Sequence, residues 1–256
     1  MTTATTELVA AWAEPEGVVP RGTLLVVPGR GEHPAVYARF GRRISADGYR
    51  VLVVDDPTTD PGATTGRIRE LLGDTGSGPH PRVLVGSDTG ALFAAGLVAS
   101  GAVEVDALVL AALPIAAPTV EVDWGSELEA RTACPVHQAL LDGDPSVRRG
   151  TLAEAVPPGW PTAADPARIT VPVLGLHGLA DTVAPVAAAR DWYGRLAEVE
   201  LVGIVGGRHD ALNDQSHRTA AATVVRFLER LRSGLPEIAR LDLVRRGGRV
   251  IGTVSR

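Results

Sequence analysis

The stretch Gly86-Ser87-Asp88-Thr89-Gly90 constrains this chain more than any other. A short run of β-branched and apolar residues, Val83–Val85, ends at its first glycine, and apolar residues continue after its last glycine over a helical length, Ala91–Leu97. This pattern predicts a strand, a sharp turn and a helix. We expect one side chain, that of Asp88, at the apex of the turn.

The two glycines have the spacing of a nucleophile elbow. In that turn a glycine stands two residues before the reactive residue and another two after it, because the backbone segments approach too closely for side chains. Gly86 and Gly90 fit this rule, and Asp88 is therefore the candidate nucleophile. Ser87 lies one residue early, where its side chain points away from the tip. Capping of the following helix is another role open to Asp88, since that position favours aspartate.

Two later turns add an acid and a histidine. Asp181 follows the predicted strand Val171–His177, and His209 follows the predicted strand Val199–Val205. The order nucleophile, acid, histidine is that of the α/β-hydrolase fold. Asp210 is a rival acid, but we favour Asp181 because an acid adjacent to the histidine in sequence seldom faces its ring.

With these residues in place, the chain from residue 20 to about 232 resembles the monoacylglycerol lipase and lysophospholipase-like group of α/β-hydrolases. The turn Pro28-Gly29-Arg30-Gly31-Glu32 is similar to the His-Gly-x-Gly-Glu oxyanion loop of that group, with proline in place of histidine. The resemblance implies that Asp88 occupies the nucleophile position. It also implies that the backbone N–H groups of Arg30 and Thr89 are the oxyanion donors.

The same resemblance assigns the base to His209 and the acid to Asp181. An aspartate nucleophile forms an alkyl or acyl enzyme, which water activated by His209 then hydrolyses. This role requires a neutral imidazole, and its pKa would be near about 6.5 if unperturbed. Asp181 would hold the imidazole in the required tautomer.

Elbow aspartates are similar to those of haloalkane dehalogenases and epoxide hydrolases, but the match is partial. A dehalogenase would have tryptophan after the aspartate, where Thr89 stands, and an epoxide hydrolase would have tyrosines in its cap, where this chain has none. Other side chains of the cap are candidates for the missing donor or for the wall of a substrate pocket. They are Trp124, Cys134, His137 and Trp160.

Three functions are compatible with these residues. The first is a hydrolase that acts on a mostly apolar small molecule, an epoxide, lactone or ester, through Asp88, His209 and Asp181. The second is a lyase, isomerase or cyclase of secondary metabolism that uses Asp88 as a base or positioning group. The third is a catalytically retired protein that binds a ligand, although a receptor has little reason to keep a base and its orienting acid.

Alternating strand and helix patterns predict one α/β-hydrolase domain over residues 1–256, with a mainly parallel sheet between helices. A proline-rich stretch, about 113–168, is expected to be a small cap with helices near Glu127–Arg131 and Pro135–Leu141. Two alternating runs around Gly247-Gly248 predict a hairpin over about 240–255, which needs cover from the sheet edge or from a second copy of the chain. Further expected elements are an edge strand over Glu7–Ala13, strands Thr23–Val27, Val51–Val54 and Val105–Ala112, and helices Ala35–Asp47, Thr64–Gly73, Val186–Ala197 and His217–Arg232.

The composition of the chain limits the kinds of partner that we expect it to bind. The net charge of −5 leaves no electrostatic footprint for nucleic acid. No targeting segment or membrane span stands out, so we expect a cytoplasmic protein away from membranes. The chain has one cysteine and no cluster with zinc-site spacing. We therefore expect a small-molecule substrate, no metal, no cofactor, and a homodimer as one way to cover the hairpin.

Overall fold

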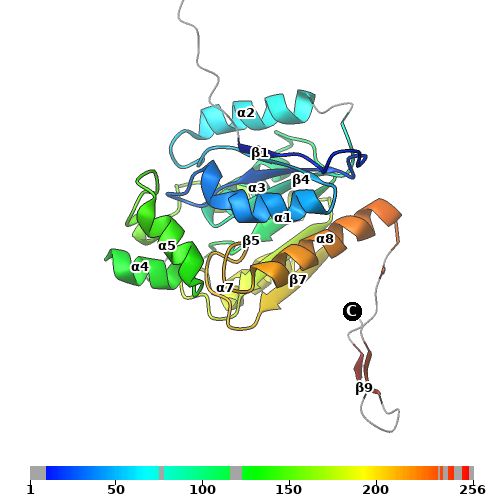
Figure 1. Cartoon of the computed structure of the whole chain (residues 1–256). Helices are drawn as coiled ribbons and strands as arrows, with labels where there is room; N and C mark the ends of the chain where they lie inside the picture. The colour runs from blue at the N-terminus through cyan, green and yellow to red at the C-terminus, as the bar shows by residue number, and fades with distance from the viewer. Residues whose placement is uncertain are drawn as a thin grey trace, which may run out of the picture.

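The computed structural model describes residues 10–74, 78–115, 123–235, 237–238, 242–244 and 250–253. A seven-stranded sheet forms the centre of the molecule (Figure 1). The edge strand β1 pairs antiparallel with β3, and every other pairing in this sheet is parallel. The predicted mainly parallel sheet is thus confirmed. In spatial order the strands are β1 (Ala10–Trp12), β3 (Arg50–Val53), β2 (Thr23–Val27), β4 (Arg82–Ser87), β5 (Ala107–Ala111), β6 (Val173–Gly178) and β7 (Val199–Ile204).

Helices cover both faces of the sheet. Helices α1 (Ala38–Ala46) and α8 (His217–Ser233) pack on one face, and α2 (Pro61–Asp74), α3 (Thr89–Ala99) and α7 (Val186–Tyr193) pack on the other (Figure 1). Along β2, Leu24 and Val26 enter the first core while Leu25 and Val27 enter the second. Side chains alternate between the faces of a strand, so an apolar run such as β2 is buried on both sides.

The helix expected over Ala35–Asp47 is divided. A 3₁₀ turn, η1 (Pro34–Tyr37), precedes α1. The hydroxyl of Tyr37 accepts a hydrogen bond from the amide of Gly29 at 3.1 Å and donates one to Glu32. These bonds hold η1 against the loop that follows β2, and the regular α-helix starts only after them.

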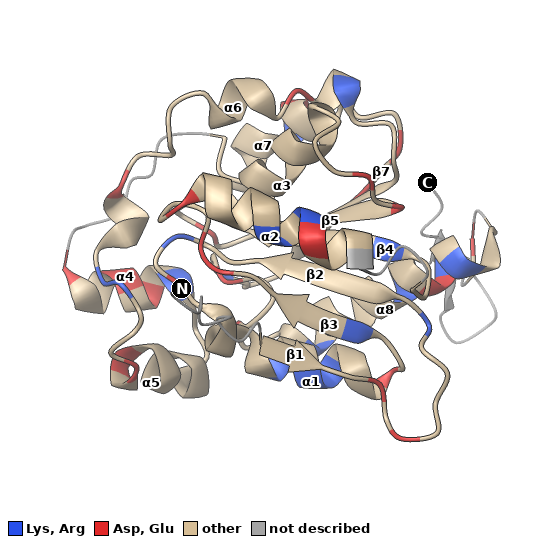
Figure 2. Ribbon diagram, turned by 90° about the horizontal axis from the view of Figure 1, so that it is seen from above, with Lys and Arg blue, Asp and Glu red and all other residues tan. Residues whose placement is uncertain are grey.

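The stretch expected to form a cap is divided. Its helices are α4 (Trp124–Arg131), α5 (Pro135–Gly143) and α6 (Trp160–Ala163), with 3₁₀ turns η2 (Thr151–Ala153) and η3 (Pro166–Arg168). Helices α4 and α5 lie at one end of the sheet, whereas α6 packs on α3 (Figure 2). The two helices expected in this region coincide with parts of α4 and α5, which lie side by side (Figures 1 and 2). Residues 116–122 of the expected insertion lie outside the described residues.

The C-terminal hairpin is a separate two-stranded antiparallel sheet of β8 (Asp242–Val244) and β9 (Val250–Thr253). It lies apart from the seven-stranded sheet in Figure 1. The Gly247-Gly248 turn lies outside the described residues, as do residues 7–9 of the expected edge strand. Among the described helices, none combines the length and apolar character needed to cross a membrane.

Candidate active site

The turn between β4 and α3 has the geometry of a nucleophile elbow. Asp88 adopts a φ of 49°, a conformation that costs of order 1–3 kcal/mol in a residue with a side chain. A Cβ added at Gly86 would collide with the backbone of Ala91, and one added at Gly90 would collide with the backbone carbonyls of Val27 and Pro28. The crowding that the sequence predicts at both glycines is therefore present.

The side chain of Asp88 does not cap helix α3. Asp88 occupies the N-cap position, but its carboxylate makes no capping hydrogen bond and is directed instead toward Arg30 and His209. The capping role considered from sequence is thus wrong for this side chain.

Asp88, His209 and Asp181 meet at the carboxyl ends of β4, β7 and β6. The Nε2 atom of His209 lies 3.3 Å from Oδ1 of Asp88, an ion-pair contact without hydrogen-bond alignment. Its Nδ1 atom lies 3.0 Å from Oδ2 of Asp181. The other oxygen of Asp181 accepts hydrogen bonds from the amides of Val183 and Ala184 at 2.8 and 2.9 Å, which fix the carboxylate.

The rival acid, Asp210, is paired with another histidine. Its carboxylate oxygen Oδ2 lies 3.0 Å from Nε2 of His137. Of the two acids weighed from sequence, Asp181 is therefore the one in contact with His209.

Arg30 enters the site with its side chain, which sequence reasoning missed. Its Nε donates to Oδ2 of Asp88 at 2.7 Å, and its Nη2 donates to Oδ1 at 2.7 Å. The side chain also donates from Nη1 to the backbone carbonyl of Glu154 in the cap. Arg30 and Asp88 are 1% and 2% exposed, so this is a buried, two-pronged ion pair. The sequence carries no signal for it, because any residue suits the third position of the oxyanion loop.

One expected oxyanion donor lies against the candidate nucleophile. The backbone N–H of Arg30 donates to Oδ2 of Asp88 at 3.1 Å. The hydroxyl of Thr89 lies 3.4 Å from the same oxygen. This edge of the site therefore concentrates hydrogen-bond donors on one oxygen of the Asp88 carboxylate.

The pKa of His209 differs from the unperturbed value considered from sequence. Burial lowers the pKa of His209, but the charges of Asp181 and Asp88 and the contacts with them outweigh burial and raise the pKa to about 10. The direction of this shift favours the imidazolium over the neutral ring that an unperturbed pKa would give at neutral pH. Burial raises the pKa of Asp88, but Arg30 and His209 reverse this effect and hold the pKa well below its usual range.

A second group of buried charges supports the oxyanion loop. Arg131 of α4 donates to Glu127 at 2.9 Å and to the backbone carbonyl of Arg30 at 3.1 Å, and its Nη1 lies 3.3 Å from Glu32. Burial and the charge of Asp210 raise the pKa of Glu32 to about 7, against the opposing effect of Arg131. The spacing of Glu127 and Arg131, four residues apart on a helix, is a signal that sequence reasoning could have used.

This group also brings potential metal ligands together. One ligand atom each from Glu32, His137 and Asp210 lies within 4.8 Å of the others. A cation already occupies this place, because Nη1 of Arg131 lies 3.3 Å from Glu32 and 3.8 Å from Asp210. The cluster is therefore arranged around a guanidinium group.

The other candidate residues from the proline-rich stretch contact residues other than Asp88, His209 and Asp181. Trp124 donates from its indole N–H to Asp142 at 2.8 Å and lies under the guanidinium of Arg149. Trp160 packs on Phe93 of α3, with ring centroids 4.8 Å apart. His137 is buried against Asp210, and the thiol of Cys134 accepts a hydrogen bond from Arg39 at 3.3 Å. A pocket role for these residues stays a prediction.

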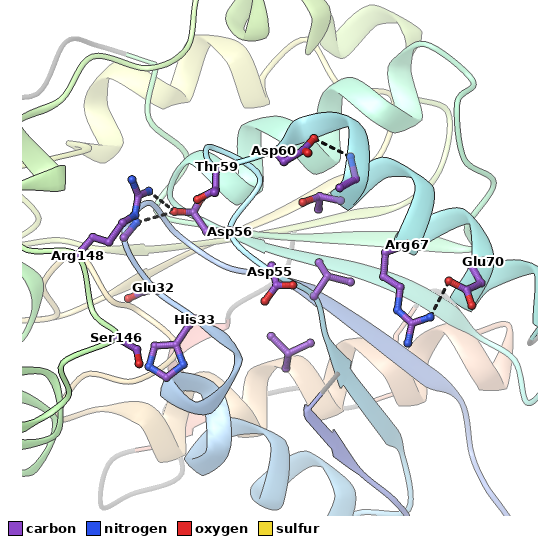
Figure 3. Close-up of a pocket in the computed structure, with 15 residues that line it drawn as sticks. Glu32, His33, Asp55, Asp56, Thr59, Asp60, Arg67, Glu70, Ser146 and Arg148 are labelled. Carbon is purple, nitrogen blue, oxygen red and sulfur yellow. Dashed lines mark hydrogen bonds and ion pairs between the residues drawn. The ribbon is translucent and has the colours of Figure 1, made fainter. Parts of the chain in front are cut away.

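A cavity of about 750 Å³ lies beside the oxyanion loop, between the end of β3, helix α2 and the cap (Figure 3). Gly31 and Arg148 line it, and Asp56 joins them by accepting from the Gly31 amide at 2.8 Å and from the Arg148 side chain at 2.6 Å. Its wall includes none of Asp88, His209 and Asp181. The oxyanion loop therefore lies between this cavity and Asp88.

The sheet order, the elbow and the convergence of Asp88, His209 and Asp181 are those of an α/β-hydrolase fold. A family model described as serine aminopeptidase, S33, matches residues 70–216, more than half of the chain. The chain belongs to this family, and Asp88 stands at the apex of its elbow. No curated protein sequence matches the chain significantly.

Solved structures with the same fold include enzymes with different substrates. Monoacylglycerol lipase from Paleococcus ferrophilus has a TM-score of 0.72 and 19% identity, with 88% of this chain and 98% of that chain covered. A soluble variant of monoglyceride lipase from Saccharomyces cerevisiae has a TM-score of 0.72 and 16% identity, covering 87% and 91%. Proline iminopeptidase from Mycobacterium smegmatis has a TM-score of 0.64 and 14% identity, covering 88% and 95%. At these identities the likeness shows the fold alone.

Proposed function

We propose that this protein is a hydrolase that opens an epoxide, lactone or ester through a covalent intermediate on Asp88, which is an ester when the substrate is an epoxide and an acyl anhydride when it is a lactone or ester. The observation that supports this most is the different surroundings of the two carboxylate oxygens. Oδ2 accepts the backbone N–H of Arg30 at 3.1 Å, and Oδ1 lies 3.3 Å from Nε2 of His209. In an ester of Asp88, the first oxygen would be the carbonyl oxygen beside its donor, and the second would carry the substrate beside the imidazole.

With an epoxide, the first step joins Oδ1 of Asp88 to a ring carbon and breaks the bond between that carbon and the ring oxygen. The imidazolium of His209 gives its Nε2 proton to the released oxygen, so the high pKa of His209 suits this step. The products are a hydroxyalkyl ester and a neutral imidazole. This route needs no tyrosine in the cap.

In the second step, neutral His209 takes one proton from water while the hydroxide adds to the carboxyl carbon of Asp88. The charge on Oδ2 grows toward the backbone N–H of Arg30. Collapse breaks the ester bond, the other water proton remains with the released alcohol, and Asp88 and His209 return to carboxylate and imidazolium. Loss of one carboxylate charge in the ester lowers the pKa of His209, which favours its role as a base.

Oxygen-18 labelling tests this route on a substrate found in a panel of epoxides. In the first turnover in labelled water, the product should be unlabelled and the Asp88 peptide should gain the label. His209→Gln removes the acid of the first step and the base of the second, so it should form a protein adduct with the mass of the substrate more slowly than the wild type and then fail to hydrolyse it. Asp88→Asn should lose at least about 1000-fold in kcat. Label wholly in the first-turnover product, with full activity in Asp88→Asn, would refute the proposal.

The second candidate is a ligand-binding protein without turnover. The observation that favours it is the Arg30 side chain, which occupies both oxygens of Asp88 in a buried ion pair. In that case neither product nor protein adduct should form with epoxides, lactones or esters, although ligands should still bind. A third candidate, the lyase, isomerase or cyclase, would release product without label in either product or Asp88.

A further inference from the structure

The guanidinium of Arg30 depends on Asp88 for its charge balance. It is 1% exposed and directs two of its nitrogens at the Asp88 carboxylate, 2.7 Å away in each case. Its third nitrogen contacts a neutral group, the backbone carbonyl of Glu154. The nearby cation Arg131 disfavours a second unbalanced charge in this region, while the carboxylate of Glu154, an exposed residue, attracts it from further away.

The proposed reaction removes the negative charge of Asp88 that balances the Arg30 guanidinium. Both oxygens of Asp88 are engaged by Arg30, so attack on a substrate requires the guanidinium to release at least one of them. The ester that follows has no charge. A neutral substrate would therefore leave the buried guanidinium without a carboxylate in contact, because the remaining anion, Asp181, lies against His209 instead.

We infer that the substrate carries a carboxylate that replaces Asp88 on the Arg30 guanidinium. The inference rests on the proposed function for the reaction but only on the ion pair for the binding. The planar guanidinium binds carboxylates through two parallel hydrogen bonds, as it binds Asp88 here. A carboxylate held on Arg30 would lie directly beside Asp88, so the reactive carbon would be a few bonds from the acid group. The substrate class is thus a short carboxylic acid that bears an epoxide, lactone or ester.

Binding to Asp88→Asn tests this without turnover. The substitution keeps the shape of the side chain and leaves Arg30 without its counter-ion. Sodium butyrate should bind this variant at least about 10-fold more tightly than it binds the wild type, because it no longer competes with Asp88, and it should raise the Tm of the variant. Butyramide, which has the same size without the charge, should do neither. In the double variant with Arg30→Gln the butyrate effect should disappear.

A second variant and a control complete the experiment. If Asp88→Asn does not fold, Asp88→Ser removes the same charge and should show the same gain. Glu154→Gln should leave the butyrate affinity of Asp88→Asn within about twofold, because its carboxylate is not the partner of Arg30. Equal binding of butyrate and butyramide, or equal binding with and without Arg30, would overturn the inference. Selective butyrate binding without oxygen-18 in Asp88 would instead refute the proposed reaction and leave the anion site standing.

Discussion

The residues around Asp88 form a set of four balanced charges. With the raised pKa of His209, Arg30 and His209 carry the positive charges, and Asp88 and Asp181 carry the negative ones. Contacts of 2.7 to 3.3 Å join Arg30 to Asp88, Asp88 to His209, and His209 to Asp181. Each of the four side chains is at least nine-tenths buried. Removal of a single charge from such a set costs more than the loss of one surface ion pair, because it leaves another charge buried and unpaired.

The pKa of His209 predicts how stability depends on pH. Its value of about 10 in the folded protein is above the ordinary value of 6.5, so the folded state holds its proton more tightly than the unfolded state. The stabilisation is fully present below pH 6.5 and is lost as pH rises toward 10. The loss should not exceed roughly 1.4 kcal/mol per pH unit.

Denaturant unfolding at several pH values checks this prediction against His209→Gln, which cannot titrate at this position. The difference in unfolding free energy between wild type and variant should shrink from pH 6.5 to pH 10. The raised pKa of Glu32, about 7, is present in both proteins and cancels in the difference. A difference that stays constant over this range would show that the imidazole is neutral in the folded protein.

At the scale of elements, the sequence predicted the features that depend on a local pattern of residues, namely the elbow and the ends of the strands. Glycine spacing indicated the elbow, and strand ends indicated where Asp181 and His209 would meet Asp88. The side chain of Arg30 could not be predicted, because its partner is 58 residues away and the loop constrains only its backbone. The contact of Arg131 with Glu32 was missed for a similar reason, since these residues are 99 positions apart, whereas the spacing of Glu127 and Arg131 was a local signal that went unused.

Helix α4 offers a test of that buried network. Arg131→Met removes a guanidinium shared by Glu32 and Glu127 and leaves these carboxylates buried. We expect a loss of about 3–5 kcal/mol in unfolding free energy. The matched control is Arg43→Met in α1, whose i,i+4 pair with Asp47 is half-exposed and 3.7 Å long. The control should change stability by less than about 1 kcal/mol, and similar losses in both variants would contradict the assigned role of the network.

At the scale of the whole molecule, the C-terminal hairpin stands outside the main sheet. An isolated two-stranded hairpin is only marginally stable. The sequence suggested two ways to cover the hairpin, the edge of the sheet or a second copy of the chain. Because β8 and β9 add no strand to the seven-stranded sheet, we expect the second copy to cover them.

Truncation after α8, which removes residues 236–256, tests this expectation. The truncated protein should have a lower Tm or a smaller mass in solution than the full chain, by scanning calorimetry and light scattering at the same protein concentration. A point substitution on the surface of α2 at Gly66, where nothing lies within 4 Å of an added Cβ, serves as a control that should leave the mass unchanged. An unchanged Tm and mass on truncation would count against the hairpin as an interface.

The ion pair of Arg30 and Asp88 also affects how fast a ligand can bind. A ligand that approaches Asp88 finds both carboxylate oxygens occupied and the site closed to solvent. Its association must wait for a spontaneous opening of this pair, and the opening frequency does not depend on how much ligand is present. The observed association rate should therefore reach a plateau at high ligand concentration, far below the diffusion limit. Arg30 would then limit the rate of ligand association as well as determine which ligand binds.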